Sequence, residues 1–364
     1  MTTRIKQQRG LNSLKPYVPG KPIEEVQREY GLKNVIKLAS NENPLGPSPK
    51  ALAAIELTLP KLNLYPDGQS YYLRQALAEH LGVEPEQVIV SNGADGVITQ
   101  TCLAYLEENN EVIVSRSSFP IYDNATHVMR AKLIKTPLKN YGLDMEAMAQ
   151  AITDKTKLIF VCNPNNPTGT IVTADEVDVF MERVPDHVLV IFDEAYYEFA
   201  VSHEYPDTLK YIREGQGNVM IVRTFSKAYG MAGVRLGYAI AMPETLAPLN
   251  VAREPFAVNL LAQAAGIAAL EDEEFVEKSV AANRAGLLFL YGEFDRLGLR
   301  YVKSHTNFVL VEIGPQATVV HQRLLEQGVI VRPCTGYDLP NFLRISVGDE
   351  VQNARLVEAL ERVL

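Results

Sequence analysis

The sequence predicts an α/β fold in which a mostly parallel central sheet is flanked by helices and followed by a smaller α+β domain. Short runs rich in Val, Ile and Leu alternate with helical patterns up to about residue 225. These runs are continuously apolar, which is typical of parallel strands buried on both faces. After Pro255 the order changes to a long helix, then strand, helix, strand, strand and helix. We therefore expect an N-terminal arm packing with the small domain (1–44), a large domain (45–255) and a small domain (256–364).

The composition is that of an ordinary soluble globular protein. At 364 residues, with 47% hydrophobic and 22% charged residues, the chain can form two cores. Its formal net charge of −9 argues against a surface for nucleic acid or anionic membranes. Three scattered cysteines and six histidines lack the spacing of a metal site, so we expect no metal. No apolar run resembles a signal peptide or a membrane span, so we expect a cytoplasmic protein.

The arm contains few regular elements. Pro16, Pro19 and Pro22 break any long helix within residues 1–40. Residues 38–47 are rich in turn-forming residues and have too little apolar content for an element. This segment is either a linker or a loop that lines a site.

The large domain alternates helices with short buried strands. Leu73, Leu77 and Leu81 share one face of a predicted helix over 70–81, and a second helix follows over 97–106. Thr173 and Glu176 form a capping box that opens a helix ending near residue 183. Strands are predicted over 88–90, 112–114, 158–161, 188–192 and 219–222.

The small domain begins with one long Ala- and Leu-rich helix over roughly 258–292. A second helix is predicted near 317–327, and Asp349 caps a C-terminal helix. Strands are predicted over 307–312, 329–331 and 342–347.

Polar residues follow the predicted strands of the large domain. Ligands bind beyond the carboxyl ends of parallel strands, so these residues should meet at one edge of the sheet. The turn at 91–96 leads into a helix whose positive end suits a phosphate. The other strands are followed by Asn166, by Asp193 and Tyr196, and by Lys227 and Arg235.

Alone, each of these features has an ordinary interpretation: a surface lysine, a helix cap, a core tyrosine, half of a salt bridge or a plain turn. Together they describe a site for pyridoxal 5'-phosphate. A lysine forms a Schiff base with the cofactor aldehyde, and a buried carboxylate holds the pyridine nitrogen protonated. Tyrosine and asparagine bind the ring oxygen, while arginine, hydroxyls and a helix N-terminus bind the phosphate.

Three motifs resemble those of the aspartate aminotransferase superfamily, fold type I. They are Asn163-Pro-Asn-Asn-Pro-Thr-Gly169, Asp193-Glu-Ala-Tyr196 and Ser226-Lys-Ala-Tyr-Gly-Met-Ala-Gly-Val-Arg-Leu-Gly-Tyr238. From end to end the chain is similar to the histidinol-phosphate aminotransferase family. That similarity is carried by residues 14–21, 38–46, 65–67, 91–95 and 342–348.

The resemblance implies roles for individual residues. Lys227 would bind the cofactor and move the proton of the reaction, Asp193 would pair with the pyridine nitrogen, and Tyr196 and Asn166 would bind the ring oxygen. Phe119 would stack on the ring. The phosphate would be surrounded by Ala94, Asp95, Thr224, Ser226 and Arg235. Tyr65 would reach the neighbouring subunit's cofactor, which implies a homodimer. Substrate would be bound by Tyr17, Asn43, Arg332 and Arg344, with Arg344 taking an anionic end.

The implied reaction exchanges an amino group between L-histidinol phosphate and 2-oxoglutarate, giving imidazole-acetol phosphate and L-glutamate, in histidine biosynthesis. Three alternatives remain open: an aminotransferase for aromatic amino acids, a decarboxylase of a phosphorylated amino acid, and a cofactor-binding protein without catalysis. Two residues depart from the family pattern, Gly96 in place of Glu and Ala257 in place of Asn. Both bear on substrate preference.

Overall fold

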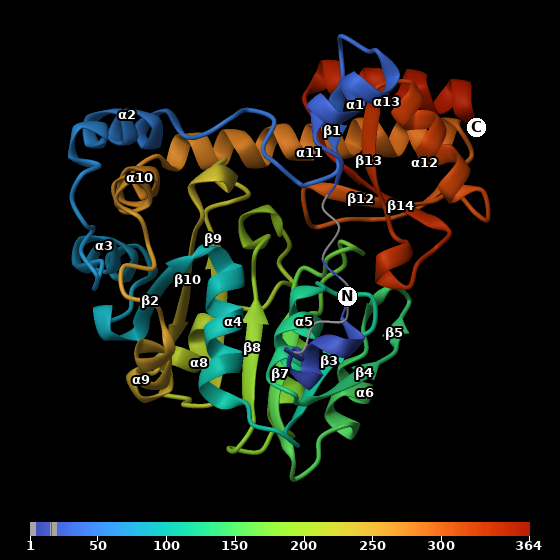
Figure 1. The fold of residues 1–364 in the computed structure, drawn as a ribbon. Coiled ribbons are helices and arrows are strands. Elements are labelled where there is room, and N and C mark those ends of the chain that lie inside the picture. Colours follow the sequence, from blue (N-terminus) through green and yellow to red (C-terminus); the bar gives the residue numbers. More distant parts are fainter. Residues whose placement is uncertain (1–4, 15, 17–19) are drawn as a thin grey trace.

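The computed structural model describes residues 5–14, 16 and 20–364, which form two helix-covered sheets (Figure 1). The larger sheet has seven strands in the order β2-β10-β9-β8-β7-β3-β4. Its strands are β2 (Val88–Asn92), β3 (Glu111–Ser115), β4 (Lys132–Thr136), β7 (Thr156–Cys162), β8 (Leu189–Asp193), β9 (Val219–Thr224) and β10 (Leu236–Ala241). A two-residue ribbon pairs β5 (Leu138–Lys139) with β6 (Gly142–Leu143).

The predicted mostly parallel sheet is confirmed, with one antiparallel strand inside it. Strands β4, β3, β7, β8 and β9 pair in parallel. Strand β10, which the sequence analysis did not predict, runs antiparallel to both β9 and β2. The apolar residues of β10 directly follow the glycine-rich turn after Lys227. The sequence pattern therefore does not separate this strand from the turn.

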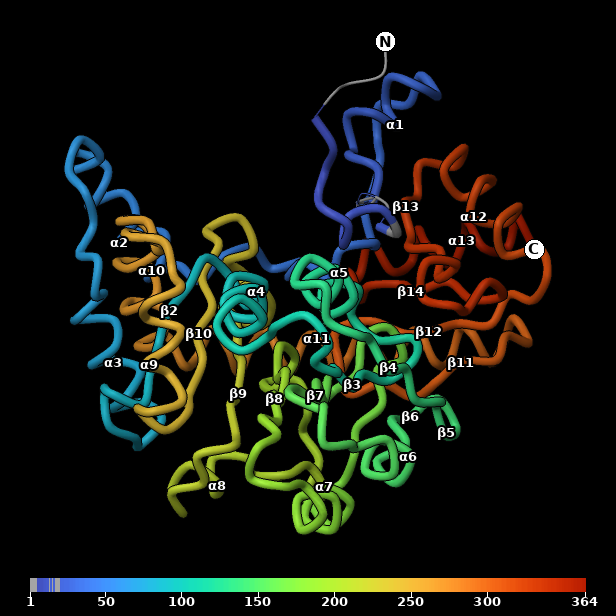
Figure 2. Tube along the Cα trace, turned by 60° about the horizontal axis from the view of Figure 1, so that its bottom comes forward, coloured from blue at the N-terminus to red at the C-terminus, as the bar shows by residue number. Residues whose placement is uncertain are grey.

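Helices cover both faces of this sheet, because alternate side chains of each central strand enter different cores (Figure 2). In β8, Val190 and Phe192 belong to one core, and Leu189 and Ile191 belong to the other. The first face carries α3 (Tyr71–Leu81), α6 (Met145–Gln150), α7 (Ala174–Met181), α8 (Leu209–Arg213) and α10 (Leu260–Leu270). The second carries α4 (Gly93–Tyr105), α5 (Ile121–Val128) and α9 (Pro243–Ala252).

The second sheet has five strands in the order β1-β13-β14-β12-β11. They are β1 (Ile36–Leu38), β11 (Arg300–Val302), β12 (Phe308–Glu312), β13 (Val329–Pro333) and β14 (Phe342–Ser346). Its helices are α12 (Ala317–Glu326) and α13 (Glu350–Val363), and both halves of the Asp349 capping box are present. Strand β1 comes from the N-terminal arm and pairs in parallel with β13, which brings residues 39–41 to the edge of this sheet.

The arm contacts two parts of the molecule. Helix α1 (Ile23–Tyr30) places Val26 in a small core with Ala39, Leu325 and Ile330. The short helix η1 (Arg9–Ser13) lies against α5 instead. Helix α2 (Pro49–Thr58) follows the arm and packs on α10. The three-part division of the chain stays a prediction.

The long helix predicted over 258–292 is in fact two helices, α10 and α11 (Glu273–Arg296). The break lies at Asp272, whose Oδ2 accepts a hydrogen bond of 2.6 Å from Ser48 Oγ. The backbone N–H of Lys50 also donates to this oxygen, at 3.4 Å. These contacts come from a segment more than two hundred residues earlier, so helical periodicity could not reveal them. Helix α11 then runs toward the second sheet and buries Leu290 and Phe294 in its core (Figure 1).

Within residues 5–14, 16 and 20–364, no helix is both long enough and apolar enough to cross a membrane. The same ranges hold no group of three or more His, Cys, Asp or Glu side chains arranged to bind a metal ion.

Candidate active site

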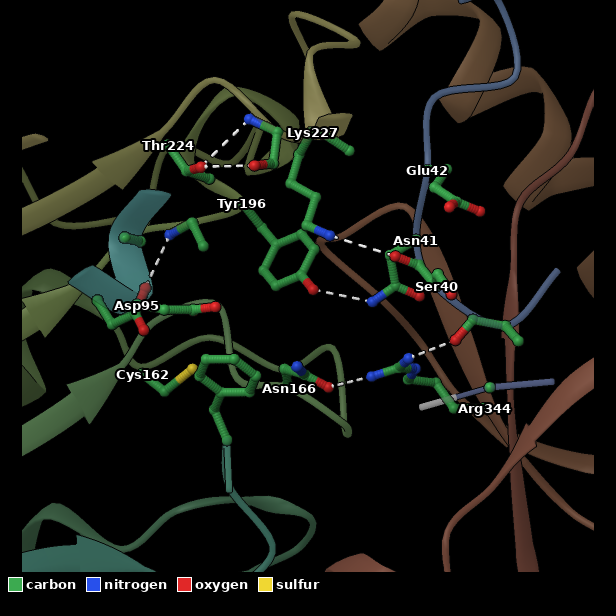
Figure 3. A pocket seen from close by; sticks show the side chains of 18 of the residues that line it. Ser40, Asn41, Glu42, Asp95, Cys162, Asn166, Tyr196, Thr224, Lys227 and Arg344 are labelled. Atoms are coloured by element: carbon green, nitrogen blue, oxygen red, sulfur yellow. Dashed lines mark hydrogen bonds between the residues drawn. The ribbon is translucent and has the colours of Figure 1, made fainter. Parts of the chain in front are cut away.

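A cavity of about 270 Å³ lies between the carboxyl ends of the large sheet and the edge of the second sheet (Figure 3). Both sheets and the arm contribute to its walls. The large sheet and its loops supply Ala94, Asp95, Phe119, Cys162, Asn166, Asp193, Ala195, Tyr196, Thr224, Ser226, Lys227, Ala232 and Arg235. The arm and the second sheet supply Gly20, Ala39, Ser40, Asn41, Glu42, Tyr337 and Arg344.

Lys227 extends its amine into the cavity from the loop that follows β9. Its Nζ donates a hydrogen bond of 3.3 Å to the backbone oxygen of Ser40 and lies 5.8 Å from the centre of the Tyr196 ring. Burial, together with the nearby positive charge of Arg344, lowers the pKa of this amine from 10.5 to about 8. The neutral, nucleophilic form of the amine is therefore far more populated near neutral pH than it is for an ordinary lysine.

Asp193 ends β8, and its carboxylate faces the cavity. Tyr122 donates a hydrogen bond of 2.5 Å to Oδ2, and the backbone N–H of Ala195 donates one of 3.2 Å to Oδ1. Burial raises the pKa of the carboxyl from 3.8 to about 6, and the Tyr122 hydrogen bond opposes this rise. The neighbouring Glu194 is paired with Arg223 at 2.8 Å, both deeply buried, so it is already neutralised. Of this carboxylate pair, Asp193 alone lines the cavity.

Tyr196 and Asn166 lie between Asp95 on one side of the cavity and Arg344 on the other (Figure 3). The Tyr196 hydroxyl accepts a hydrogen bond of 2.8 Å from Asn41 Nδ2. Burial raises the pKa of this phenol above its ordinary value, so the hydroxyl keeps its proton. Asn166 Oδ1 accepts a hydrogen bond of 2.6 Å from Arg344. Asn166 therefore joins the loop after β7 to the second sheet.

One end of the cavity is built to hold an anion. Helix α4 begins there, and no side chain among the described residues caps its first N–H groups. Thr224 and Ser226 place their hydroxyls 3.0 Å apart, and Arg235 Nη1 lies 3.5 Å from Ser226 Oγ. Arg235 also pairs with Asp95 at 3.5 Å, and this pair is half exposed. These donors converge as a phosphate requires.

Gly93, at the start of α4, permits this arrangement. Its φ is +76°, and a Cβ there would lie 2.4 Å from Nη2 of Arg235. A similar contact concerns Gly96, where a Cβ would lie 2.3 Å from Oγ of Ser91. The serine hydroxyl therefore occupies space that a side chain at position 96 would need. Ser91 Oγ itself is buried without a hydrogen-bond partner among the described residues.

Arg344 enters the cavity from β14, in the second sheet. Its side chain is 4% exposed. Besides its bond to Asn166, it donates from Nη2 to the backbone oxygen of Ala39 at 2.8 Å and from Nη1 to Tyr337 at 3.3 Å. Its guanidinium lies 5.2 Å from the centre of the Phe308 ring. These contacts hold a fixed positive charge at the second-sheet side of the cavity.

The structure brings eleven of the predicted residues to this cavity. They are Ala94, Asp95, Phe119, Asn166, Asp193, Tyr196, Thr224, Ser226, Lys227, Arg235 and Arg344. Phe119 meets Tyr122 edge to face, with ring centres 5.8 Å apart. The roles given to these residues stay predictions.

Three predicted residues, Tyr65, Asn43 and Arg332, are not among the residues that line the cavity. Tyr65 is 82% exposed and stacks on Phe256 with ring centres 4.7 Å apart. Asn43 donates to Ala228 O and Ser279 Oγ, each at 2.9 Å. Arg332 lies opposite Arg344 in the β13–β14 pair but is not among the residues that line the cavity. Tyr17 lies outside the described residues.

Sequence reasoning missed several residues that shape the site. The most consequential are Tyr122, Ser40 and Asn41, which contact Asp193, Lys227 and Tyr196 respectively. Tyr122 lies on α5, three residues after Phe119. Because Phe119 was predicted to line the site, the neighbouring aromatic residue could have been considered as well. Ser40 and Asn41 lie in the turn-rich segment 38–47, for which the sequence is compatible with either a linker or a loop that lines a site. It lines the site.

Comparison with known proteins shows the family of this chain. The family described as aminotransferase class I and II matches residues 33–360. A histidinol-phosphate aminotransferase of Moorella thermoacetica is 49% identical over 364 residues, which is 100% of this chain and 94% of that protein. Histidinol-phosphate aminotransferase 2 of Carboxydothermus hydrogenoformans is 45% identical, with 98% of each chain covered.

A solved structure is similar along the whole chain. The crystal structure of histidinol-phosphate aminotransferase from Sinorhizobium meliloti, in complex with pyridoxal-5'-phosphate, superposes with a TM-score of 0.90 at 29% identity. The match covers 100% of this chain and 98% of that one.

Proposed function

Because this chain belongs to the class I and II aminotransferases, and within them to the histidinol-phosphate aminotransferase family, we propose that it exchanges an amino group between L-histidinol phosphate and 2-oxoglutarate. The products are imidazole-acetol phosphate and L-glutamate, and the cofactor is pyridoxal 5'-phosphate. The observation that carries this proposal is the placement of Lys227, Asp193 and an anion cradle around one cavity, in a chain 49% identical over its full length to a protein of that name.

The residues of the cavity fit the cofactor. An uncapped helix end, two hydroxyls and an arginine suit its phosphate, and a buried carboxylate suits its ring nitrogen. When bound, the cofactor supplies an aldehyde that bonds to amines and a ring that draws electrons from the adjoining carbon. Lys227, with its lowered pKa, provides the amine that would hold it.

Each polar residue then has a defined task. Asp193 would hold a proton on the ring nitrogen, and its desolvated position strengthens that interaction. Tyr196 would donate its hydroxyl proton to the ring oxygen. Lys227 Nζ would remove the proton from the substrate carbon that bears the amine. Phe119 would cover one face of the ring.

One arginine can serve both substrates. Each substrate carries an anion next to the carbon that bears its amine: glutamate has its α-carboxylate there, and histidinol phosphate has a phosphate linked through a CH₂ group. Arg344 is permanently charged, planar and held by two acceptors, so it can bind either anion without moving far. We also propose that Tyr17, Asn43 and Arg332 complete the substrate site.

The proposal includes a homodimer in which Tyr65 reaches the neighbouring subunit's cofactor. The segment from α2 to α3 carries an unusual number of exposed apolar and aromatic side chains for a soluble surface. They are Leu52, Leu57, Leu59, Leu62, Leu64, Tyr65, Tyr71 and Tyr72. A second copy of the chain would cover them. The cysteines Cys102, Cys162 and Cys334 are free and buried, which suits the cytoplasmic location that we propose.

A half-reaction titration tests the function. The cofactor-loaded enzyme is mixed separately with histidinol phosphate, glutamate and phenylalanine, and loss of the visible band of the lysine-linked cofactor is followed. We expect histidinol phosphate and glutamate to remove the band at micromolar to millimolar concentration. A faster response to phenylalanine identifies an aromatic aminotransferase, release of carbon dioxide identifies a decarboxylase, and no response to any amine identifies a protein without catalysis.

A further inference from the structure

A chain of hydrogen bonds runs from the second sheet to the phenol of Tyr196. The backbone N–H of Asn41 donates to Ser346 Oγ at 2.9 Å, and that hydroxyl donates to Asn41 Oδ1 at 2.8 Å. Asn41 Nδ2 then donates to the Tyr196 hydroxyl at 2.8 Å. Asn307 holds the same residue from another side, donating to its backbone oxygen at 3.0 Å. Asn41 is 1% exposed.

The direction of this chain is determined by its first member. A backbone N–H can only donate, so Ser346 Oγ must accept from it and turn its own proton elsewhere. That proton is directed at Asn41 Oδ1, which leaves the NH₂ group of the amide facing Tyr196. If the oxygen and nitrogen of this amide were exchanged, the NH₂ group would face the Ser346 hydroxyl proton, and two donors would meet. The observed orientation is therefore the favourable one.

Tyr196 is therefore forced to accept on this side and to direct its own proton away from Asn41. Among residues 5–14, 16 and 20–364, the structure shows no acceptor for that proton. Tyr196 lines the cavity between Lys227 and Asn166, so the proton is available to a ligand there.

We propose that Asn41 is a positioning residue that makes Tyr196 a hydrogen-bond donor to the oxygen of the cofactor ring. This inference rests on the proposed function and adds a residue that is not in its cofactor-binding set. Ser346 lies two residues after Arg344 on β14. The strand that carries the proposed anion-binding arginine therefore also determines, through Asn41, the direction of the Tyr196 hydroxyl proton.

The backbone at position 41 restricts which residues can serve. Its φ is +55°, a region that Asn, Asp and Gly adopt with little strain. Asn alone of these three can accept from Ser346 and donate to Tyr196 at once. Asn41→Gly keeps the backbone and removes the amide, whereas Asn41→Asp keeps the shape and offers Tyr196 an acceptor.

The test is the pKa of the visible chromophore, measured by pH titration of the cofactor-loaded protein without any amino substrate. A donor to the ring oxygen stabilises its anion and lowers the pKa at which the chromophore loses its proton. We expect Asn41→Gly to raise this pKa by about half a unit to one unit, and Asn41→Asp to raise it by at least as much. Asn140→Gly is the matched control, because Asn140 is exposed and has a similar φ of +51°.

A double-mutant cycle decides whether Asn41 acts through Tyr196. In a Tyr196→Phe background, Asn41→Gly should leave the chromophore pKa unchanged, because the phenol it orients is gone. The proposal is overturned if the shift persists in that background, or if neither Asn41 variant shifts the pKa in the parent. Should Asn41→Gly fail to fold, Asn41→Asp carries the same cycle. Because no amino substrate is used, a wrong substrate assignment leaves this test intact, and a parent that forms no visible band contradicts the proposed function itself.

Discussion

Tyr122 and Asp193 form a buried pair beneath the cavity, with the phenol donating to the carboxylate across 2.5 Å. The pair joins α5 to the end of β8 and sits on the floor of the site. Neither side chain has appreciable solvent exposure, so this hydrogen bond and the one from the Ala195 N–H must offset much of the cost of burying a charge. The two hydrogen bonds do so only in part, because the pKa of Asp193 stays raised at about 6.

Asp193→Asn should therefore stabilise the cofactor-free protein while damaging the enzyme. The folded carboxyl binds a proton more tightly than the unfolded one, so the stability of the parent falls as pH rises from about 4 to 6 and the loss is complete above 6. At pH 7.5 we expect the free energy of unfolding to rise by about 1–3 kcal/mol. Urea unfolding at several pH values measures it, and equal stability of variant and parent at pH 7.5 would contradict the account.

Lys227→Ala should keep the fold and abolish the chemistry. The substitution removes a partly desolvated amine, so the melting temperature of the cofactor-free protein should not fall. The visible band of the lysine-linked cofactor should be absent, and turnover should fall by at least about 1,000-fold. Absorbance, circular dichroism and a steady-state assay follow these changes. A variant that retains parental turnover would remove Lys227 from the site.

Capture of the cofactor should depend on pH through the same amine. Only neutral Lys227 attacks the aldehyde, and its pKa of about 8 means that the neutral fraction rises as pH increases through that value. The rate of formation of the visible band from cofactor-free protein should therefore rise between about pH 7 and 9 and then level off. Stopped-flow mixing with pyridoxal 5'-phosphate measures it. A rate still rising steeply toward pH 10.5 would indicate an ordinary exposed lysine.

Arg344→Lys should weaken both substrates together. Lysine keeps the charge but cannot bond Asn166 and Ala39 while presenting a planar pair of donors to an anion. We expect kcat/KM to fall by about 10- to 1,000-fold for glutamate and for histidinol phosphate alike. The control is Arg300→Lys, since Arg300 is exposed on the edge strand β11. A loss confined to one substrate would show that separate residues bind the two anions.

Subunits carrying different defects should complement one another if Tyr65 acts across the dimer. A Lys227→Ala subunit paired with a Tyr65→Ala subunit contains one site with both residues intact. Random mixing of the two inactive proteins in equal amounts, after subunit exchange, should therefore restore about a quarter of parental activity. If Tyr65 served its own subunit, or the protein were a monomer, mixing would restore nothing.

Local sequence patterns were sufficient to locate the central strands of the large domain and the polar residues that follow them. Apolar runs located β7, β8 and β9, and the residues just beyond them supplied Asn166, Asp193 and Lys227. Parallel strands deliver their carboxyl ends to one edge, so a linear order of motifs became a spatial cluster. The Thr173 capping box was likewise readable, because both of its partners lie within one turn of helix.

Other features depended on contacts between distant segments. The break at Asp272 is held by Ser48, and β10 completes the sheet by antiparallel pairing with two strands that flank it in space. The periodicity of apolar residues shows which side of a segment is buried, but it does not show which other segment packs against that side. The exposure of Tyr65 likewise became visible only with the fold in view.

The sequence by itself determined that this chain forms an α/β sheet whose strand ends carry a lysine, a carboxylate, a phenol and an anion cradle, since each of these follows from residues close together in the chain. Only the tertiary structure decided how the polar groups are oriented. Tyr122 beneath Asp193, and Ser346 and Asn41 behind Tyr196, come from different elements, and tertiary packing brings them against residues that line the cavity. The direction of a hydrogen bond depends on every partner at once, and those partners are up to 305 residues apart in the chain.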